Sequence, residues 1–425
     1  MTQAPDFVLT KPDVYKTCRI QLTSPILHIG SAVSKLNPFE CVQTGRRVYL
    51  PDQNALARAL KERGRLDDFI QRVEDRGDIT SLLEDTFGDR WQTALTSEGD
   101  RLFPEHLISA KWTGEKITEL RPMIRNGLGQ LYIPGSSLKG AIRTAIAYYL
   151  LKHAERFNVP QQNQISAIES RLRKSMGELR HRAKFTDDSL FMNRLFADFD
   201  LIYQGKPVSA REGPNTDFMR AVHVTDSDPL IEQEIVNKRG QKGAINQAIT
   251  TEVIVSSHFP DWKAKYRASI YTEMVRLAQT QFTITLDETM LSWFRHSQRM
   301  TLPFQTIEDL LKICQEFAQD QWDHEHYYWQ EVKNNPNAQG KNLDFSDIRT
   351  LYEPEQCPFS LRVGWASGMA GTTVNLLLDD NLRMEIRDTC GLKAPGFEAP
   401  KSRRTVVGSS GAIKFVPGWV KFKVV

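Results

Sequence analysis

Apolar residues recur at steps of three and four after Pro134-Gly135 and predict a long helix with one buried face. The apolar positions of this helix are Leu138, Ala141, Ile142, Ala145, Ile146 and Tyr149. The short apolar run at residues 131–133 predicts the end of a strand, and the hydroxyl of Ser136 or Ser137 is expected to cap the helix. We therefore expect a strand, a tight turn and a capped helix in succession.

Lys139 and Arg143 stand four residues apart on another face of this helix. Like charges at that spacing repel by a few tenths of a kcal/mol, and a polyanion alongside would reverse the sign of the interaction. The free N–H groups, the serine hydroxyls and the lysine at one helix start also form a corner that suits an anion. A capped core helix is the simpler interpretation, and this segment alone does not decide between the two.

Strand and helix patterns follow one another along the rest of the chain and predict an α+β fold. We expect strands at residues 15–22, 220–226, 252–256, 267–271 and 361–365, and a hairpin between residues 39–42 and 47–50. We expect helices at residues 53–63, 161–184 and over most of 288–333, and a loop at 334–341. Asp52 is the predicted N-cap of the first of these helices. A domain boundary near residue 230 divides the chain into residues 1–230 and 231–425.

Composition narrows the class of protein. The 425 residues carry a formal net charge of only +3, so a local patch must supply any site for a polyanion. The most basic segments are residues 161–184, where a solvated helix face is the commoner role, and 399–425. Five scattered cysteines suit a reducing cytosol and no disulfide framework. The polar segment 1–11 does not resemble a signal peptide, and no apolar stretch is long enough to span a membrane, so we expect a cytoplasmic protein.

Several patterns that could carry chemistry give weak signals. Gly135 and Gly140 have the spacing of a P-loop, but Ala141 follows and the lysine comes too early, so nucleotide hydrolysis is not expected. His28 follows the first strand and could accept a ribose 2′-hydroxyl proton, although a structural histidine is commoner. Residues 323–326 contain two histidines and two acids on a predicted helix, where positions two apart diverge, so no metal site is expected.

A glycine-rich loop follows the predicted strand at residues 361–365. Gly364, Gly368 and Gly371 would let the backbone approach a ligand closely. This loop and the helix start at residue 136 make two anion sites rich in backbone N–H groups, and the basic tail supplies cations nearby. The cations of the tail are Lys401, Arg403, Arg404, Lys414, Lys421 and Lys423, and the first three are assigned to the site. The combination suits a phosphodiester chain better than a small substrate and predicts sequence-independent RNA binding.

Four segments resemble, in order, motifs of the RAMP superfamily of CRISPR-associated RNA-binding proteins. They are residues 23–30, 132–144, 220–227 and 362–368. Residues 400–404 and 417–420 are similar to the closing segment of one subgroup. That subgroup is the type III-A (Csm) subunit that caps the effector backbone near the 3′ end of the guide RNA. The motifs are short, but together they extend over nearly the whole chain.

The resemblance implies a ferredoxin-like, RRM-type core domain in residues 1–230. It implies a second, divergent ferredoxin-like half in residues 231–425, with helical insertions in both. The implied partners are crRNA and target RNA, the backbone RAMP subunit and small subunit of a type III effector, and a host nuclease that trims the 3′ end. No cofactor and no membrane partner are implied.

Pattern and resemblance together assign a set of residues to contacts with guide-RNA phosphate and ribose. The set is His28, Gly30, Ser136, Ser137, Lys139, Arg143, Gly364, Gly368, Gly371, Lys401, Arg403 and Arg404. Two functions that act on RNA stay open, beside that of a scaffold unrelated to RNA. Residues 31–38 lack the aspartate with which the repeated backbone subunit cleaves target RNA, which favours a non-catalytic subunit that caps the complex and supports crRNA maturation and antiviral interference. The alternative is a metal-independent CRISPR-RNA processing endonuclease, with His28 as general base and a lysine as electrostatic stabiliser.

Overall fold

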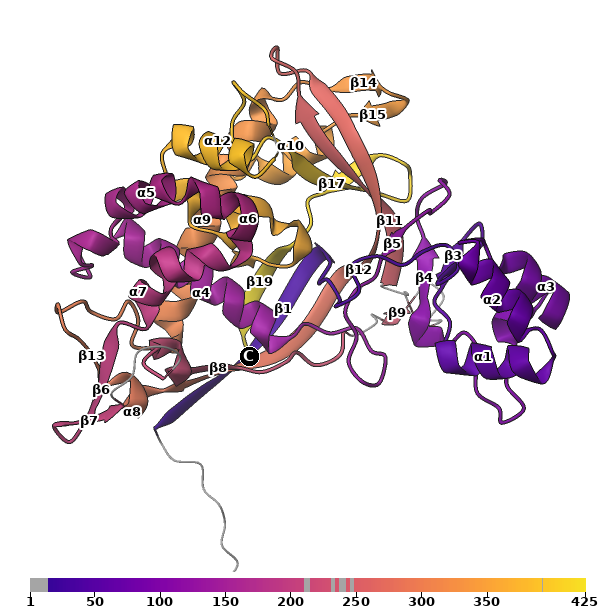
Figure 1. Ribbon diagram of the computed structural model, residues 1–425, viewed down its shortest axis with the longest axis horizontal. Coiled ribbons are helices and arrows are strands. Elements are labelled where there is room, and N and C mark those ends of the chain that lie inside the picture. Colours follow the sequence, from indigo (N-terminus) through magenta and orange to yellow (C-terminus); the bar gives the residue numbers. More distant parts are fainter. Residues whose placement is uncertain (1–13, 210–214, 231–233, 237–241, 245–247, 392) are drawn as a thin grey trace, which may run out of the picture.

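A large mixed sheet organises the protein (Figure 1). The computed structural model describes residues 14–209, 215–230, 234–236, 242–244, 248–391 and 393–425, so the polar segment 1–11 lies outside the described residues. The main path of the sheet runs in the order β16-β19-β1-β12-β11-β4-β3-β2. Its central neighbours are antiparallel, and β4 joins β11 in parallel. The predicted α+β class is confirmed.

Strands β1 (Tyr15–Leu27) and β12 (Ala264–Asp287) form the centre of this sheet. They are antiparallel along the whole of β1, with Tyr15 opposite Asp287 and Leu27 opposite Val275. Ile20 and Leu22 are fully buried, whereas Arg19 is exposed. This is expected where successive side chains point to opposite faces of a sheet. The strand predicted at residues 15–22 is confirmed and continues to Leu27.

The remaining strands of this sheet are short, apart from β11. They are β2 (Val42–Gln43), β3 (Arg47–Tyr49), β4 (Ile108–Lys111), β5 (Leu120–Arg121), β8 (Val222–Val224), β11 (Ala248–His258), β16 (Leu361–Arg362), β17 (Arg403–Val407), β18 (Ile413–Phe415) and β19 (Trp419–Val424). The hairpin predicted between residues 39–42 and 47–50 is confirmed as β2 and β3, which pair antiparallel. Residues 131–133, predicted as a strand end, form only an isolated bridge between Leu131 and Arg125, so that prediction is wrong.

Three small sheets lie outside the main one. They comprise β6 (Phe199–Tyr203), β7 (Lys206–Ser209) and β13 (Phe294–His296); β9 (Glu234–Val236) and β10 (Lys242–Ala244); and β14 (Asn335–Ala338) and β15 (Lys341–Leu343). The last pair corrects the loop predicted at residues 334–341. Gln339 and Gly340 both have positive φ, at 54° and 80°, which suits a two-residue hairpin turn. The Asn335 amide anchors the hairpin by donating to the carbonyl of Ala264 at 2.8 Å.

Helices α4 (Gly135–Lys152) and α9 (Ile307–Glu331) pack against each other beside the sheet (Figure 1). The apolar face predicted for α4 is confirmed at Leu138, Ile142 and Ala145, which are fully buried in the main core. α9 starts with a capping box in which Thr306 and Asp309 bond each other's backbone N–H groups. The helical stretch predicted at residues 288–333 is interrupted by strand β13.

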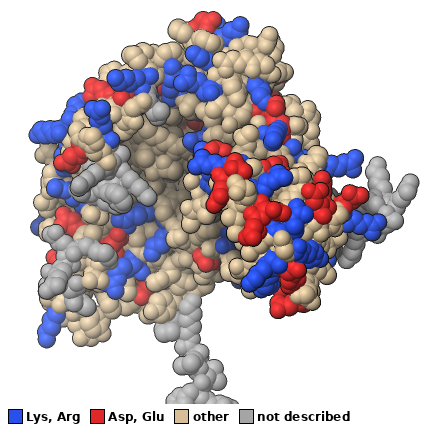
Figure 2. Space-filling view, turned by 45° about the vertical axis from the view of Figure 1, so that its right-hand side comes forward, with Lys and Arg blue, Asp and Glu red and all other residues tan. Residues whose placement is uncertain are grey.

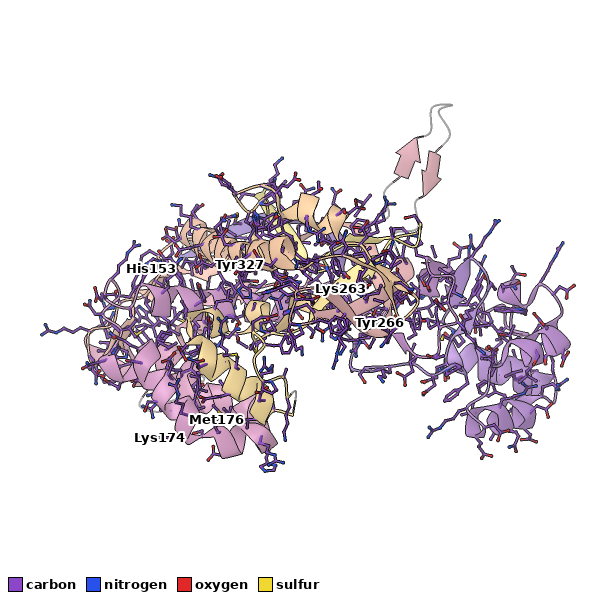
Figure 3. All side chains as sticks on the ribbon, turned by 90° about the horizontal axis from the view of Figure 1, so that it is seen from above. His153, Lys174, Met176, Lys263, Tyr266 and Tyr327 are labelled. Carbon is purple, nitrogen blue, oxygen red and sulfur yellow. The ribbon has the colours of Figure 1, made fainter. Side chains whose placement is uncertain are left out.

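The other helices form a group beside α4 and a separate lobe. They are α5 (Ile165–Lys174), α6 (Met176–Asp187), α7 (Asn193–Phe196), α8 (Glu288–Leu291), α10 (Ser346–Tyr352), α11 (Gly368–Thr372) and α12 (Asp380–Thr389), with α1 (Gln53–Glu62), α2 (Leu66–Glu74) and α3 (Thr80–Phe87) in the lobe. Figure 3 shows the lobe at one end of the molecule and the labelled Lys174 and Met176 toward the other. The predicted cap of α1 is confirmed, because the Asp52 carboxylate accepts the Ala55 N–H at 2.9 Å. The lobe has its own core around Trp91 and Phe103.

Strands from both sides of residue 230 share the main sheet, since β1 and β12 are neighbours. The division into residues 1–230 and 231–425 stays a prediction. None of the described helices combines the length and apolar character that crossing a bilayer requires.

The first strand and the glycine-rich loop meet at His28. The His28 ring is 1% exposed, and its Nδ1–H donates to the carbonyl oxygen of Glu273 at 2.7 Å. The N–H of Trp365 donates to the His28 carbonyl at 3.2 Å. Gly364 has φ +87°, and a Cβ there would lie 2.3 Å from the His28 carbonyl oxygen. Only glycine permits this approach, so Gly364 fixes the loop against the end of β1.

Replacing Gly364 with alanine is expected to destabilise the protein more than the same change at Gly368. Both residues have positive φ with ψ near −175°, a region that costs a residue with a Cβ about 1–3 kcal/mol. The Cβ at Gly368 would meet nothing within 4 Å, whereas at Gly364 it would overlap the His28 carbonyl. The overlap should add about 1–3 kcal/mol, measured as a larger fall in the free energy of unfolding. Equal losses in Gly364→Ala and Gly368→Ala would show that the close approach is unimportant.

Stability is expected to fall as the pH drops from about 6.5 to about 4. The pKa of His28 is lowered to about 4, chiefly by burial; Glu273 opposes this shift and Arg121 adds to it. The unfolded chain therefore binds a proton in this window before the folded chain does, which costs up to roughly 3 kcal/mol for this histidine. Thermal unfolding from pH 7 to pH 4.5 should show a shallower pH dependence in His28→Gln than in the natural protein, and parallel curves would contradict the assignment.

Candidate nucleic-acid interface

Two arginines lie over the ring of Trp365 in the glycine-rich loop. The guanidinium carbons of Arg121, from β5, and Arg404, from β17, are each 4.6 Å from the ring centroid. The His28 ring meets Trp365 edge-on at 5.6 Å, so the contact described above also holds this tryptophan. We call Arg121, Trp365 and Arg404 the tryptophan–arginine patch. In the part of the chain that the structure describes, neither arginine has an ion-pair partner.

The charges of this patch repel one another. Burial lowers the pKa of Arg404, and the neighbouring cations Arg121 and Arg362 lower it further. Burial also lowers the pKa of Arg121. Stacking on an aromatic face stabilises a guanidinium without neutralising it. The patch therefore presents uncompensated positive charge beside a flat ring, which is the combination that phosphate and nucleobase binding use.

A cleft of about 560 Å³ lies between the glycine-rich loop, α12 and the start of β17. Its basic lining residues are Arg267, Arg362, Arg387, Lys393, Lys401, Arg403 and Arg404. We call it the cationic cleft. Among the described residues that line this cleft, Glu325 is the one acid, and its Oε1 lies 2.9 Å from Nε of Arg403. Burial opposes the charge of Glu325, but Arg403 and the other nearby cations outweigh it and lower its pKa.

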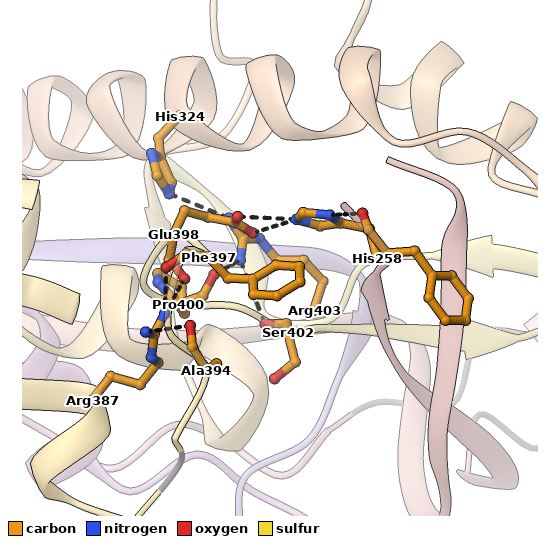
Figure 4. Close-up of polar contacts among 10 residues, drawn as sticks. His258, His324, Arg387, Ala394, Phe397, Glu398, Pro400, Ser402 and Arg403 are labelled. Atoms are coloured by element: carbon orange, nitrogen blue, oxygen red, sulfur yellow. Dashed lines mark hydrogen bonds and ion pairs between the residues drawn. The ribbon is translucent and has the colours of Figure 1, made fainter. Parts of the chain in front are cut away.

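Hydrogen bonds fix one wall of the cationic cleft (Figure 4). Arg387 donates to the carbonyls of Ala394, Phe397 and Glu398 at 2.8, 2.5 and 2.7 Å. The Glu398 carboxylate contacts His258 Nε2 at 3.0 Å. These bonds hold the turn before Lys401, so that its ammonium lies 3.4 Å from the Phe397 ring centroid. The wall is rigid and carries a cation at its edge.

The start of α4 differs from the sequence prediction. Pro134 is the N-cap, and no side chain caps at this position, so the prediction that Ser136 or Ser137 caps the helix is wrong. The Gly135 N–H instead donates to Oδ1 of Asp226 at 2.8 Å. A Cβ on Gly135 would lie 2.4 Å from the carbonyl oxygen of Val224, so glycine lets β8 pass close to the helix. A carboxylate thus already lies where the sequence predicted an external anion.

The side chains of Lys139 and Arg143 are partly buried. Arg143 forms an ion pair with Asp217 at 2.5 Å and lies 3.8 Å over the Phe196 ring. Burial lowers the pKa of Lys139, with Asp217 opposing and Arg143 reinforcing the shift. The repulsion predicted between the two cations is therefore offset by Asp217. Arg143 supports packing and is not presented as a separate cation.

The structure brings together only part of the predicted residue set. Gly368, Lys401, Arg403 and Arg404 line the cationic cleft. His28, Gly364 and Gly371 support the loop from below; a Cβ on Gly371 would lie 2.8 Å from Cβ of Ser367. Gly30, Ser136, Ser137, Lys139 and Arg143 lie away from the cleft lining. Gly30 forms an isolated β-bridge with Met123, and Ser136 is exposed to solvent.

Sequence reasoning missed several cations of this site. They come from separate segments and belong to no basic run; they are Arg121, Arg267, Arg362, Arg387 and Lys393. Trp365 was visible as part of the glycine-rich loop, but nothing local marked the arginines over its ring. The helix predicted at residues 323–326 contributes two contacts to Arg403. Glu325 forms an ion pair with Arg403, and Nε2 of His324 lies 3.3 Å from Nη2 of Arg403. Over the described residues, no group of three or more potential metal ligands converges.

The α1–α3 lobe offers no comparable patch. Figure 2 shows Lys and Arg side chains mixed with Asp and Glu side chains over its surface. Ion pairs such as Arg58–Asp100 and Arg65–Asp68 compensate some of its cations. The face of the lobe that Figure 2 presents therefore carries charges of both signs.

Comparisons with known proteins identify the family. The family model of the RAMP superfamily matches residues 19–349. No curated protein matches the chain. A chain from the cryo-EM structure of a Csm–crRNA–target RNA ternary complex in a type III-A CRISPR–Cas system is similar over 96% of this chain and 100% of that chain, with a TM-score of 0.62 and 22% identity.

The crystal structure of T. onnurineus Csm5 is similar over 95% of this chain and 100% of that chain, with a TM-score of 0.55 and 19% identity. At these identities the structural similarity establishes a shared fold. The family model extends over well beyond half of the sequence, from β1 to α10; it includes His28 and ends before the glycine-rich loop. This chain belongs to the RAMP superfamily.

Proposed function

We propose that this protein is a non-catalytic crRNA-binding subunit of a type III CRISPR effector, which caps the 3′-end side of the complex. One observation carries the proposal: the tryptophan–arginine patch adjoins the cationic cleft, and its cations lack carboxylate partners among the described residues. The similar chain in a Csm–crRNA–target RNA complex supports the same role.

The chemistry of the patch favours backbone contact over base reading. Guanidinium groups bind phosphate oxygens in a bidentate manner, and such contacts depend little on sequence. The Trp365 ring holds both guanidinium groups in place for such contacts. Guide RNAs differ in sequence, so a subunit of this kind needs affinity without base specificity.

Fold and partners follow from the same proposal. We take the large sheet to consist of two ferredoxin-like halves that are joined through β1 and β12 and carry helical insertions. Target RNA, the backbone RAMP subunit and the small subunit are the proposed partners, with a host nuclease that trims the 3′ end. The proposed location is the cytoplasm, where crRNA maturation and antiviral interference take place.

The endonuclease alternative lacks an accessible base at the predicted position. The His28 ring is 1% exposed, and its Nδ1–H is committed to the Glu273 carbonyl. Its Nε2 is buried behind Trp365. A general base must come within hydrogen-bond reach of the proton it removes, and a ribose at the surface cannot approach this nitrogen.

Replacing Arg121 and Arg404 together with alanine should weaken crRNA binding and flatten its salt dependence. Each lost phosphate contact removes roughly 0.7 from the slope of log affinity against log salt for a single strand, so the double variant should lose roughly 1.4. Filter binding over a series of salt concentrations measures this slope. Arg58→Ala with Lys61→Ala on the lobe removes the same charge and should leave the slope unchanged. If the patch variant keeps the natural slope, the proposed contact is excluded.

CRISPR-repeat RNA should remain intact when incubated with this protein in EDTA. The expectation follows from the burial of His28. Denaturing electrophoresis would reveal cleavage, and end analysis would reveal a cyclic phosphate. A cyclic-phosphate product that disappears with His28→Gln would establish the endonuclease and overturn the non-catalytic assignment.

A further inference from the structure

We propose that the cationic cleft binds an RNA end that carries a terminal phosphomonoester. The inference rests on the proposed function in taking RNA as the ligand. It adds a second subsite, which adjoins the tryptophan–arginine patch and shares Arg404 with it, and which distinguishes a phosphorylated end from a continuous strand.

The first argument is the number of positive charges without partners. Two of the lining cations are neutralised: Arg403 by Glu325 at 2.9 Å and Arg387 by Asp388 at 2.8 Å. The others have no ion-pair partner in the described ranges of the chain; they are Arg267, Arg362, Lys393, Lys401 and Arg404. A backbone phosphodiester carries one negative charge, whereas a terminal phosphomonoester carries about 1.5 to 2 at neutral pH. Such an excess of cations suits the monoester.

The second argument is mutual repulsion at the edge of the cleft. Burial lowers the pKa of Lys401, and the cations Arg267, Lys265 and Arg387 lower it further. Three of these groups reach the same space from β12, α12 and the segment before β17. An anion bound among them would relieve the repulsion, and the gain grows with the charge of the anion.

The third argument is that the cleft contains neutral donors as well as cations. The Ser257 hydroxyl lines the cleft, its residue is 1% exposed, and it has no hydrogen-bond partner among the described residues. A buried hydroxyl without a partner is costly, and a phosphate oxygen would satisfy it. Gly368, with φ +69° and open space at its Cβ position, lets a ligand approach the backbone on the opposite side.

The fourth argument is an apolar chamber next to the cleft. This chamber of about 230 Å³ shares Met369, Ile386 and Cys390 with the cleft lining. Its walls include Leu179 and Phe191, and the Nδ2 of Asn375 in its lining is buried without a partner in the described part of the protein. A cationic space beside an apolar one fits a phosphate with its attached sugar and base, and one amide donor suits a base carbonyl. The pair of spaces favours a nucleotide over an inorganic ion.

The test uses the full chain and one short RNA with an internal fluorophore in three forms. One form has hydroxyl groups at both ends, one carries a 5′-phosphate and one carries a 3′-phosphate. Fluorescence anisotropy should show about tenfold tighter binding of one phosphorylated form than of the hydroxyl-ended form. The 5′ and 3′ arms identify which end the cleft receives.

Two variants locate the preference. Arg267→Ala with Lys401→Ala, at an exposed and a partly exposed position of the cleft, should reduce the preference to about twofold or less. Arg121→Ala, in the tryptophan–arginine patch, should weaken all three forms by the same factor and keep their ratio. Thermal unfolding of both variants checks that the fold is retained.

The outcomes separate the two proposals. Equal affinity of the natural protein for all three RNAs overturns the inference, as does a preference that persists in the cleft variant. Failure to bind any RNA overturns the proposed function instead. In that event, calorimetric titration with adenosine monophosphate tests the cleft by itself: binding that is lost in Arg267→Ala with Lys401→Ala supports the phosphate site, and absence of binding to the natural protein overturns it.

Discussion

The close approach of Gly364 to the backbone of His28 determines the geometry of the tryptophan–arginine patch. The Trp365 N–H bonds the same carbonyl, so the tryptophan ring is fixed relative to β1. Arg121 and Arg404 then stack on this ring from β5 and β17, which belong to the same sheet. A backbone contact between segments far apart in sequence thus decides where positive charge meets the solvent.

Carboxylates decide which cations stay available. Asp217 neutralises Arg143, Glu325 neutralises Arg403, and Asp226 takes the N–H at the start of α4. Each of these contacts removes a group that the sequence alone offered to RNA. The charges of Arg121 and Arg404 stay uncompensated because no acid lies within ion-pair distance of them in the described chain. An overall charge of +3 is therefore compatible with a strongly positive face, since pairing is uneven over the surface.

The motifs that resemble the RAMP superfamily act mainly through packing. Gly135 lets β8 pass beside α4, and Gly364 lets the loop touch β1. His28 is neutral near physiological pH because burial lowers its pKa to about 4, and it supports Trp365 from within. Short motifs of this kind identify a fold because they mark points where backbones come close. The cations that act on the ligand need not lie inside them.

The sequence by itself determined the local elements, where periodicity and turn chemistry are sufficient. β1, the β2–β3 hairpin, the Asp52 cap and the buried face of α4 followed from residue patterns. It also singled out the glycine-rich loop and the basic tail. Tertiary structure decided which of those residues face a ligand, because ion pairing and burial depend on distances between segments that lie far apart in the chain. Nothing local predicted that Arg121 would stack on Trp365 or that Asp226 would reach the start of α4, yet one adds a charge to the tryptophan–arginine patch and the other occupies the predicted anion site.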